Sequence, residues 1–367
     1  MRVLFAGGGT AGHVSPAIAI AEALMKQDKR NEVAFVGRVG GEENNAVTSR
    51  GYKLYTVNIK GFSRKISVSN IKSACLAFCA LERAKRIIKD FSPDVIVGTG
   101  GYVCWPVLKS GIRLGIPTAL HESNIYPGLV TRRLFRKLSI LLLNSDLSLE
   151  FLTDINNYRV VGNPVRCGFE KENRAVSRRS LGIKENEFFI VSFGGSLGAQ
   201  KLNTAALALM KSFSVRNKSV RHLHATGTRY YEEIIKDFPT LPDRCSVTAY
   251  IDKMPSVLSA ADLVISRSGA MTITEIAASG TVSILIPSPT VADNHQLKNA
   301  KALSDAGAAV LIEEKDLENK LITTVHALYE NRNEREKIAA KVLEFHNPHA
   351  TESIVNEIKA LAAKKPR

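Results

Sequence analysis

Residues 266–299 read SRSGAMTITEIAASGTVSILIPSPTVADNHQLKN. A turn of small residues at 266–270 leads directly into a helix-like segment that carries Glu275. A buried-strand pattern follows at 282–286, and two prolines stop it before a polar cluster, 293–296, begins the next helix. This alternation of strands and helices is typical of an α/β fold with parallel strands.

The helix after this small-residue turn has the properties of an anion site. A helix N-terminus leaves backbone N–H groups unpaired and carries the positive end of the dipole, which suits a phosphate. A carboxylate in the first turns would repel phosphate, so Glu275 is better suited to accept hydrogen bonds from sugar hydroxyls. An ordinary capped βα unit explains this stretch equally well. Other parts of the sequence are needed to distinguish the two interpretations.

Length and charge set the first limits. A chain of 367 residues is too long for one typical core, so we expect two domains. The net charge of +15 is uneven, because residues 1–166 hold 23 Lys+Arg and 12 Asp+Glu, a balance of +11. A basic first half indicates an anionic partner, either nucleic acid or an acidic membrane face, and a merely solvated basic surface is the alternative.

Cysteines and apolar runs indicate the compartment. The five cysteines include no Cys-x-x-Cys pair, and their odd number and apolar neighbours predict reduced, mostly buried thiols in a cytoplasmic protein. The apolar run at the N-terminus is too short for a signal peptide. No apolar run approaches the ~20 residues that span a bilayer. We therefore expect a protein that does not cross a membrane.

The N-terminal segment repeats the strand–turn–helix pattern. Residues 3–6 form a short buried strand that enters the turn GGGTAGH, 7–13, and a helix follows from Pro16. Read as G-x-G-x-x-G, this turn favours a dinucleotide enzyme. The next strand, 33–36, ends in Gly-Arg instead of the acid that binds NAD ribose, so an NADP oxidoreductase stays open as an alternative.

Further strand ends carry polar or glycine-rich turns. Strand 94–97 precedes GTGGY, and strand 118–120 precedes HESN. Since parallel sheets place ligands at the carboxyl ends of their strands, these turns are candidate ligand sites. A strand near 160–161 precedes GNPVR at 162–166, which reads as a domain junction whose arginine can bind phosphate through two nitrogens.

The second half restarts the pattern and defines the domains. Strand 188–193 enters the turn GGSLGA and a helix near Lys201. Three glycine turns exceed the needs of one dinucleotide site, so we predict two Rossmann-like, doubly wound parallel-sheet domains that face a cleft. The helix-forming tail is interrupted by HNPH, which would let a last helix at about 346–367 join residues 1–163, with 164–345 as the second domain.

Six motifs in this order resemble one known family: GGTAGH at 8–13, GGY at 100–102, HESN at 121–124, GNPVR at 162–166, GGSLGA at 194–199 and SRSGA at 266–270. The chain resembles, over nearly its whole length, the MurG-type undecaprenyldiphospho-muramoylpentapeptide beta-N-acetylglucosaminyltransferases of glycosyltransferase family 28. The resemblance implies the GT-B fold, an N-terminal acceptor and membrane domain, and a C-terminal donor domain. It also implies inverting transfer of N-acetylglucosamine from UDP-GlcNAc to the 4-hydroxyl of lipid I, forming lipid II at the cytoplasmic side of the cell membrane.

The resemblance also implies which residues bind substrate. The positions that match the family's donor-binding motifs are Thr10, Ala11, Gly12, Asn124, Arg166, Ser196, Ile251, Ala270, Met271, Thr272, Ile273, Thr274, Glu275 and Gln296. In this pattern the backbone at Ile251 reads uracil, the run 270–275 binds phosphate and ribose, and Gln296 binds the sugar. Two departures stand out: Ala11 replaces a frequent glycine, and residues 103–106 are VCWP where the family usually has small residues.

The expected mechanism uses no metal and no cofactor. The chain has no Asp-x-Asp, so the usual carboxylate pair for a metal-bound nucleotide sugar is missing. Helix dipoles, backbone donors and Arg166 would stabilise the leaving UDP instead. His13 is the candidate base, because an imidazole titrates near ~6.5, although it could instead cap its turn or bind acceptor phosphate. Glu122 is a weaker alternative, better suited to an orienting role.

Basic and apolar residues intermingle at 64–89 and again at 132–137. Such a mixture favours peripheral attachment to an anionic membrane, and the alternative is that the apolar side chains are core. A related transferase acting on another lipid or glycan remains the main rival. A nucleic-acid-binding module is disfavoured because no RNA-binding signature occurs, so no nucleic acid partner is expected.

Overall fold

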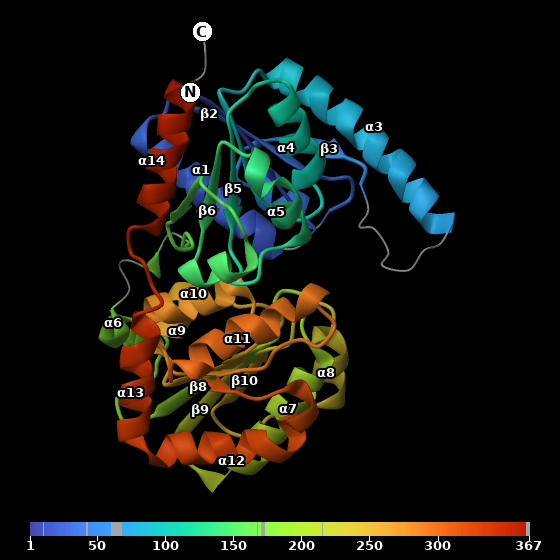
Figure 1. The fold of residues 1–367 in the computed structure, drawn as a ribbon. Coiled ribbons are helices and arrows are strands. Elements are labelled where there is room, and N and C mark those ends of the chain that lie inside the picture. The colour runs from blue at the N-terminus through green and yellow to red at the C-terminus, as the bar shows by residue number, and fades with distance from the viewer. Residues whose placement is uncertain are drawn as a thin grey trace. The chain divides into compact units, whose positions relative to one another are not determined.

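The computed structural model describes residues 1–9, 11–41, 43–59, 68–166, 168–169, 173–214 and 216–364, with the backbone alone at 11, 43, 68–75 and 214. Two compact units are present, Met1–Arg166 with Asn347–Arg367, and Cys167–His346. Each unit is built around one parallel sheet (Figure 1). Thr10, Arg64 and Lys65 lie outside the described residues, as do the side chains of Ala11, Ile71 and Lys72.

The sheet of the first unit has seven strands in the order β3-β2-β1-β4-β5-β6-β7, and every neighbouring pair is parallel. The strands are β1 (Arg2–Gly7), β2 (Glu32–Arg38), β3 (Lys53–Val57), β4 (Val95–Gly100), β5 (Thr118–Glu122), β6 (Ile140–Leu143) and β7 (Tyr158–Val160). Central strands such as β4 and β5 are buried along their length, as expected when helices cover both faces.

Helices cover both faces of this sheet. The helical segments are α1 (Ala11–Gln27), α2 (Glu43–Thr48), α3 (Val68–Phe91), α4 (Cys104–Arg113), α5 (Leu129–Leu134), η1 (Phe135–Lys137), η2 (Asp146–Phe151) and α14 (Ala350–Ala363). Leu4 on β1 packs in one core with α3 and α4, whereas its neighbour Phe5 packs in another core with α1 and α14. Adjacent strand residues thus face opposite layers, which defines a doubly wound sheet.

The sheet of the second unit has six parallel strands in the order β10-β9-β8-β11-β12-β13. Its elements are β8 (Phe188–Phe193), β9 (Val220–Ala225), β10 (Cys245–Thr248), β11 (Leu263–Ser266), β12 (Ser283–Leu285), β13 (Val310–Leu311), α6 (Arg174–Ser180), α7 (Gln200–Leu209), η4 (Met210–Ser214), α8 (Tyr231–Asp237), α9 (Met254–Ala260), α10 (Ala270–Ser279), η5 (Ala292–Asn294), α11 (His295–Asp305), η6 (Glu314–Asp316), α12 (Leu317–Glu330) and α13 (Arg332–Leu343).

In both sheets the order in which successive strands are added reverses at the first strand. In each unit the first strand lies between the second and the fourth, so the order 3-2-1-4-5-6 recurs. The switch point falls between β1 and β4 in one unit and between β8 and β11 in the other. The predicted pair of doubly wound parallel sheets is confirmed, and ligands of such sheets bind outside the carboxyl ends of the strands at this point.

The C-terminal helix belongs to the first unit. The predicted break is confirmed, because α13 ends at Leu343 and α14 begins at Ala350. In between, Asn347 Nδ2 donates to the Val161 carbonyl oxygen at 2.8 Å. Gly162 adopts a φ of 82°, and a Cβ there would meet the Cβ atoms of Asn347 and Ala350. A glycine after β7 therefore lets α14 approach the sheet, where its apolar face shares a core with α1.

The described thiols differ in burial. Cys104 is buried, Cys245 is half-buried and Cys79 is exposed, and all three are free. The prediction of mostly buried thiols is therefore wrong for Cys79, because α3 turns that position away from the sheet. Within the described ranges, no helix combines the length and the apolar character that a bilayer span requires.

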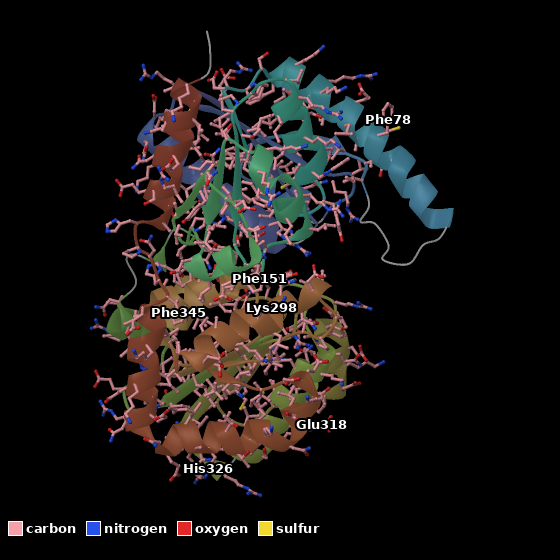
Figure 2. The ribbon with its side chains drawn as sticks, in the orientation of Figure 1. Phe78, Phe151, Lys298, Glu318, His326 and Phe345 are labelled. Atoms are coloured by element: carbon pink, nitrogen blue, oxygen red, sulfur yellow. The ribbon has the colours of Figure 1, made fainter. Side chains whose placement is uncertain are left out.

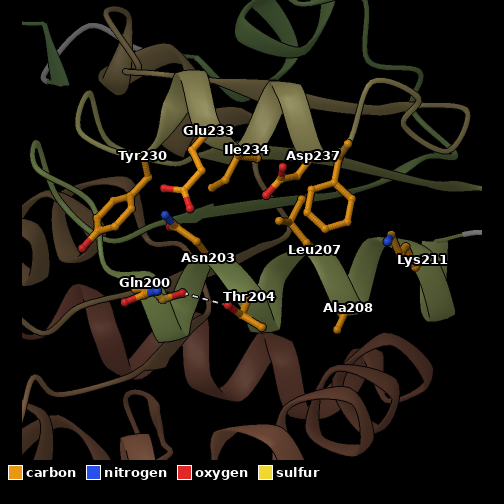
Figure 3. Close-up of a pocket in the computed structure, with 11 residues that line it drawn as sticks. Gln200, Asn203, Thr204, Leu207, Ala208, Lys211, Tyr230, Glu233, Ile234 and Asp237 are labelled. Atoms are coloured by element: carbon orange, nitrogen blue, oxygen red, sulfur yellow. Dashed lines mark hydrogen bonds between the residues drawn. The ribbon is translucent and has the colours of Figure 1, made fainter.

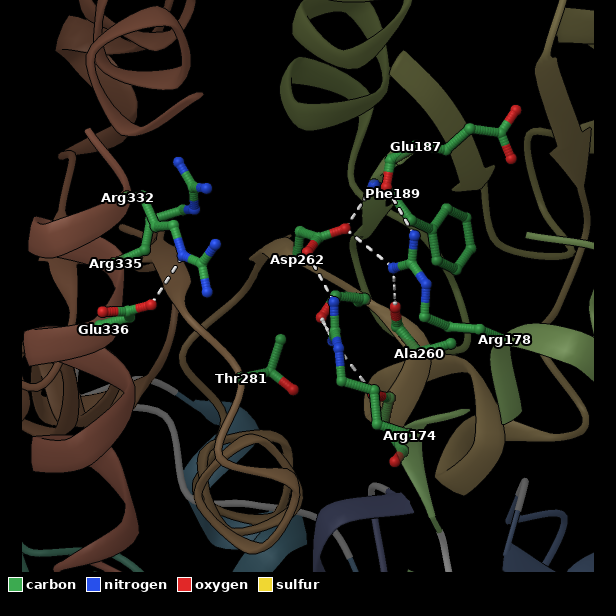
Figure 4. Close-up of polar contacts among 12 residues, drawn as sticks. Arg174, Arg178, Glu187, Phe189, Ala260, Asp262, Thr281, Arg332, Arg335 and Glu336 are labelled. Carbon is green, nitrogen blue, oxygen red and sulfur yellow. Dashed lines mark hydrogen bonds and ion pairs between the residues drawn. The ribbon is translucent and has the colours of Figure 1, made fainter. Parts of the chain in front are cut away.

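Arg178 is the buried charge that joins three segments of the second unit (Figure 4). Its side chain is 7% exposed. Nη1 donates to the Ala260 carbonyl at 2.9 Å and to Asp262 Oδ2 at 3.0 Å, while Nη2 donates to the carbonyls of Lys184 and Glu187 at 2.6 and 2.5 Å. Since α9 ends at Ala260, the guanidinium also lies at the negative end of that helix dipole.

We expect Arg178→Met to lower the unfolding free energy of the second unit by about 3–5 kcal/mol, because it leaves a carboxylate and several carbonyls without their buried partner. Arg179→Met is the matched control, since Arg179 is exposed on the same helix, and it should change stability by no more than about 0.5 kcal/mol. Urea unfolding followed by hydrogen exchange of β8 and β11 amides measures both. Equal effects of the two substitutions would contradict the role of Arg178 as the buried partner of these carbonyls and of Asp262.

Candidate active site

Backbone packs directly on backbone where β1 and β4 of the first unit end. Gly101 has a φ of 81°, and a Cβ at this position would overlap the Gly8 carbonyl oxygen. Thr99 Oγ1 donates to the His13 carbonyl at 2.6 Å and so ties β4 to the first turn of α1. These contacts fix the two turns at the switch point relative to each other, and only glycine permits them at position 101.

The buried Cys104 links the same two turns through its thiol. Its thiol lies 2.8 Å from the Ala6 carbonyl and 2.9 Å from the Gly100 carbonyl, and Gly100 N donates to the sulfur at 3.1 Å. Burial raises the pKa of this thiol to about 12, so it stays protonated and can donate. The VCWP segment at 103–106 therefore links the two turns through the Cys104 thiol. Trp105, the next residue, packs partly into the core.

The geometry assigns the tautomer of His13, which lies half-buried on α1. Its Nδ1 is 3.2 Å from the Gly8 carbonyl oxygen. Because a carbonyl only accepts, Nδ1 carries the proton and Nε2 is the basic nitrogen. Gly100 packs against the Nε2 side of the ring, where a Cβ would be 3.1 Å from Nε2. The imidazole is thus oriented by both glycine turns.

Glu122 holds the loop that follows β5. Its carboxylate is almost fully buried and accepts four hydrogen bonds. Asn124 N and Nδ2 donate to Oε1 at 3.1 and 3.2 Å, and Gly128 N and Thr131 Oγ1 donate to Oε2 at 2.8 and 2.6 Å. Both carboxylate oxygens are thus occupied by donors of the same loop, which favours the orienting role over that of a base.

The neighbouring His121 is also occupied within the fold. Its Nε2 donates to the Gly162 carbonyl at 2.9 Å, and its Nδ1 lies 3.4 Å from Ser123 Oγ. Burial lowers the pKa of His121, so the ring stays neutral. Asn163 Nδ2 completes the brace by donating to the Ser123 carbonyl at 3.1 Å. Of the four HESN residues, therefore, only Asn124 is half-buried, and the other three are buried.

The second unit repeats backbone packing at its own switch point. Gly198 has a φ of 81°, and a Cβ there would overlap the Thr226 carbonyl oxygen, while Gly227 packs against Gly198 in return. Ser196 is at the exposed tip of this turn, and its hydroxyl bonds to no residue that the structure describes. The Ser196 carbonyl accepts from Thr228 N at 3.2 Å, so the tip is held through its backbone.

Two helices begin at this switch point without a side-chain cap. α7 starts after Ala199 and α10 starts after Gly269, and neither N-cap residue bonds the helix through a side chain. Neither helix has an acidic residue in its first turn. Their unpaired backbone N–H groups and positive dipole ends form an anion site that could hold two phosphates.

Glu275 lies in the second turn of α10, beyond this anion site. It is buried, 5% exposed, and shares the buried side of the helix with Met271, Ile273 and Thr274. Ala270 and Thr272 are half-buried at the start of the helix. The placement separates the carboxylate from the N-terminal amides, as the sequence argument requires.

Gln296 is oriented by the loop before α11. Ser288 N donates to its side-chain Oε1 at 2.9 Å, and Ser268 Oγ donates to its backbone carbonyl at 2.9 Å. The side-chain amide nitrogen has no acceptor among the described residues. Asp293 and Asn294 adopt φ values of 54° and 51°, a left-handed conformation that costs non-glycine residues energy and is common at binding sites.

The predicted residues fall into two constellations. In the first unit Gly12 and His13 both lie in the first turn of α1, and Arg166 is half-buried at the end of this unit. In the second unit it brings together the turn of Ser196 and the start of α10, and buries Ile251 at 5% exposure just after β10. Sequence reasoning missed the supporting turn at 226–228, although a buried strand followed by Thr-Gly was a usable signal.

Comparisons with known proteins agree with this architecture. The model of the glycosyltransferase family 28 N-terminal domain matches residues 3–140, and that of the C-terminal domain matches 189–354. A UDP-N-acetylglucosamine--N-acetylmuramyl-(pentapeptide) pyrophosphoryl-undecaprenol N-acetylglucosamine transferase of Thermoanaerobacter sp. is 38% identical over 98% of this chain and all of its own length. The protein of the same name from Halalkalibacterium halodurans is 39% identical over 86% of this chain and 87% of its own.

A solved structure shows the same fold. The crystal structure of Acinetobacter baumannii MurG is 27% identical, has a TM-score of 0.76, and the match covers 98% of this chain and 99% of that one. Family models that together cover most of the chain, and relatives of this identity, leave no room for the dinucleotide oxidoreductase or the binding module. The chain therefore belongs to glycosyltransferase family 28.

Proposed function

We propose that this glycosyltransferase transfers N-acetylglucosamine from UDP-GlcNAc to the MurNAc 4-hydroxyl of undecaprenyl-diphospho-MurNAc-pentapeptide, lipid I, and so forms lipid II. The observation that carries the donor assignment is the pair of uncapped helix N-termini, α7 and α10, beside Glu275 and Gln296. The acceptor assignment is supported by the names of the full-length relatives.

In the donor site the anion-binding elements hold the diphosphate. The amides at the start of α10 and the Ser196 hydroxyl donate to phosphate oxygens, with Arg166 as a further cation. Glu275 accepts from the ribose hydroxyls, and the Ile251 backbone pairs with uracil. The Gln296 amide nitrogen donates to a sugar hydroxyl, because its oxygen is already bound by Ser288. Charge that develops on the leaving UDP then meets oriented dipoles that need no rearrangement.

On the acceptor side, His13 takes the proton. The acceptor 4-hydroxyl attacks the anomeric carbon in line with the departing UDP, and its proton passes to His13 Nε2. The Gly8 carbonyl stabilises the imidazolium that forms, because it accepts from Nδ1. Ala11 and Gly12, at the start of α1, contact substrate through the backbone, and Asn124 does so from the loop that Glu122 holds.

The reaction is tested with labelled UDP-GlcNAc and a lipid I analogue, without added metal. The intact chain should form the disaccharide product, and His13→Gln should lower kcat by about 10²–10⁴ while donor affinity is kept. Glu122→Gln tests the rival base. Because Glu122 is proposed to orient its loop, Glu122→Gln should lower both thermal stability and activity. His13→Gln should lower activity and leave thermal stability unchanged.

Two outcomes would change the proposal. Binding of UDP-GlcNAc with no product from lipid I, but with product from another lipid or glycan, would favour the rival acceptor. Near-normal turnover by His13→Gln would remove His13 as the base.

We expect Glu275→Gln to raise the donor KM about tenfold or more with a smaller change in kcat, since its proposed contacts form in the ground state. The matched control is the donor with a 2′-deoxyribose, which already lacks one hydroxyl partner. The substitution should cost less with this analogue, and the difference measures the Glu275–ribose interaction. An equal cost with both donors would argue against ribose contact.

Peripheral attachment to the cytoplasmic face of the membrane is part of the proposal. Phe78 is 65% exposed on α3 (Figure 2), and Arg83 and Arg86 are exposed further along the same helix. Leu81 is core, and in the second cluster Arg132 stacks on Tyr126, so those residues contribute little to a membrane surface.

Vesicle flotation measures this attachment. Phe78→Ser should weaken binding to vesicles that contain anionic lipid several-fold, and neutral vesicles should bind poorly in either case. Binding that depends on neither Phe78 nor anionic lipid would contradict this surface.

A further inference from the structure

Three polar side chains are buried together near the glycine turn of the second unit, and no step of the proposed transfer uses them. Ser192 lies on β8, two residues before the turn begins at Gly194, and His222 and His224 lie on β9. Ser192 and His224 are direct neighbours in the strand register. Ser192 Oγ lies 2.8 Å from His222 Nε2 and 2.8 Å from His224 Nδ1. The three side chains therefore form one hydrogen-bonded cluster between two central strands.

The geometry assigns the protons of this cluster. His224 Nδ1 is also 3.1 Å from the Ser192 carbonyl oxygen, which can only accept, so Nδ1 carries a proton. Since that N–H is directed at Ser192, the Ser192 hydroxyl is left to donate to His222 Nε2. A neutral His222 then carries its own proton on Nδ1. The result is a directed chain that runs from His224 Nδ1–H through Ser192 Oγ–H to His222 Nε2.

A further proton on either ring would disturb this chain. On His222 it would turn Nε2 into a donor, so the Ser192 hydroxyl would lose its acceptor, and on His224 it would add a buried charge. Burial, and to a smaller extent the neighbouring His224, lowers the pKa of His222 to about 3. Burial lowers the pKa of His224 to about 4, although its hydrogen bond to the Ser192 carbonyl acts in the opposite direction. Both rings are therefore neutral at neutral pH.

The surroundings offer a protonated ring no counter-charge. Helices α7 and α12 cover this face of the sheet, because Val220 of β9 packs in one core with both, and α8 lies beside α7 (Figure 3). The charged residues of these helices that the structure describes are all exposed. The half-buried titratable side chains on these helices, on β10 and after β11 are Tyr231, Tyr329, Cys245 and Arg267 with its partner Glu314. Within the described part of this face, the one half-buried carboxylate is thus already paired with an arginine.

The cluster joins β8 to β9 just before the two loops that meet at the switch point. His224 lies two residues before Thr226, and a Cβ at Gly198, in the turn 194–199, would overlap the Thr226 carbonyl oxygen. Asn203 Nδ2 on α7 donates to the same carbonyl at 2.9 Å. A shift of the end of β8 against the end of β9 would therefore move the turn and the start of α7 together.

Stability alone does not account for this cluster. His222 Nδ1 and His224 Nε2 are buried, and neither has a hydrogen-bond partner among the described residues. Unpaired buried polar atoms cost free energy, and apolar side chains of similar shape are often neutral or stabilising in place of a hydrogen-bonded group. Neighbouring positions on the same face, such as Ile190 and Val220, are apolar. The polar cluster therefore indicates a role other than packing.

We propose that Ser192, His222 and His224 are positioning residues that hold the turn 194–199 in place for the diphosphate of the nucleotide sugar, and that they do so only while both rings are neutral. This inference rests on the proposed function, which assigns the turn to the donor. Below about pH 6.5 an exposed imidazole gains a proton and a buried one does not, so acid favours an opened turn until the lowered pKa values are reached. Opening should rise by up to about tenfold per pH unit for each ring that it exposes.

Variants of the full chain separate positioning from packing. His224→Leu removes the N–H that bonds Ser192, and it should weaken UDP-GlcNAc binding in titration calorimetry at neutral pH about tenfold. In the transfer assay the loss should fall on the donor KM, with kcat changed less than about threefold. A merely structural role would instead lower thermal stability and leave the donor affinity of the folded protein unchanged.

The double variant His222→Gln with His224→Asn is the conservative rescue. The Asn amide nitrogen takes the place of Nδ1, and the Gln amide oxygen takes the place of Nε2, but neither side chain titrates. This variant should bind UDP-GlcNAc within about threefold of the intact chain at neutral pH. His326→Gln is the matched control, because His326 is exposed on α12 of the same unit, and it should leave donor binding unchanged.

Hydrogen exchange of the amides at 194–199 and 226–228 measures opening without a ligand. After correction for intrinsic exchange rates, opening of the intact chain and of His326→Gln should rise at least about tenfold between about pH 6.5 and pH 5. Opening of the double variant should stay nearly constant. Thermal unfolding at neutral pH shows that each variant is folded, and Ser192→Ala, which removes the hydroxyl between the rings, replaces His224→Leu if that variant does not fold.

The proposal is overturned if the variant that breaks the chain binds UDP-GlcNAc as tightly as the intact protein, if the double variant loses as much affinity, or if the double variant keeps the pH dependence of opening. An intact chain that does not bind UDP-GlcNAc would contradict the donor assignment instead. The hydrogen-exchange comparison would still test the cluster in that case, because it needs no donor.

Discussion

Direct contact between backbones at the carboxyl ends of the central strands is the constraint on which both candidate sites depend. Gly101 against Gly8 in one unit, and Gly198 against Thr226 in the other, leave no space for a Cβ. In the second unit the helices that follow the switch-point strands begin uncapped, because their N-cap residues, Ala199 and Gly269, carry no side-chain acceptor. The small residues of these turns therefore permit both the close approach and the anion site.

Most charged or polar side chains of the motifs serve this architecture instead of contacting substrate. Glu122 accepts four hydrogen bonds, and His121, whose pKa is lowered by burial, bonds to Gly162 and Ser123. Arg267, in the small-residue turn, pairs with the half-buried Glu314 and donates to the carbonyls after β12. The proposed chemistry falls to a small set, His13, Glu275 and Gln296, of which His13 is oriented by the Gly8 carbonyl and Gln296 by Ser288 N.

The sequence predicted the fold well because its signals are local. Buried strands that end in glycine turns define the parallel sheets, and the HNPH break separates α13 from α14. It predicted burial less well where a helix face decides, as at Cys79, because one position's exposure depends on which side the helix presents to the sheet. It also did not foresee the role of Arg178, since the Ala260 carbonyl and the Asp262 carboxylate that this side chain bonds lie 82 and 84 residues away in the chain.

By itself, the amino-acid order determined two doubly wound units, their glycine turns and the residue types that a nucleotide-sugar site requires, because strand burial, turn conformation and helix capping are properties of neighbouring residues. Only the tertiary structure decided which nitrogen of His13 is basic and that Glu122 holds its own loop through four hydrogen bonds. These contacts join residues at most nine positions apart, yet they form only in the folded turns, and Thr99, 86 residues from His13, fixes the turn that orients the imidazole.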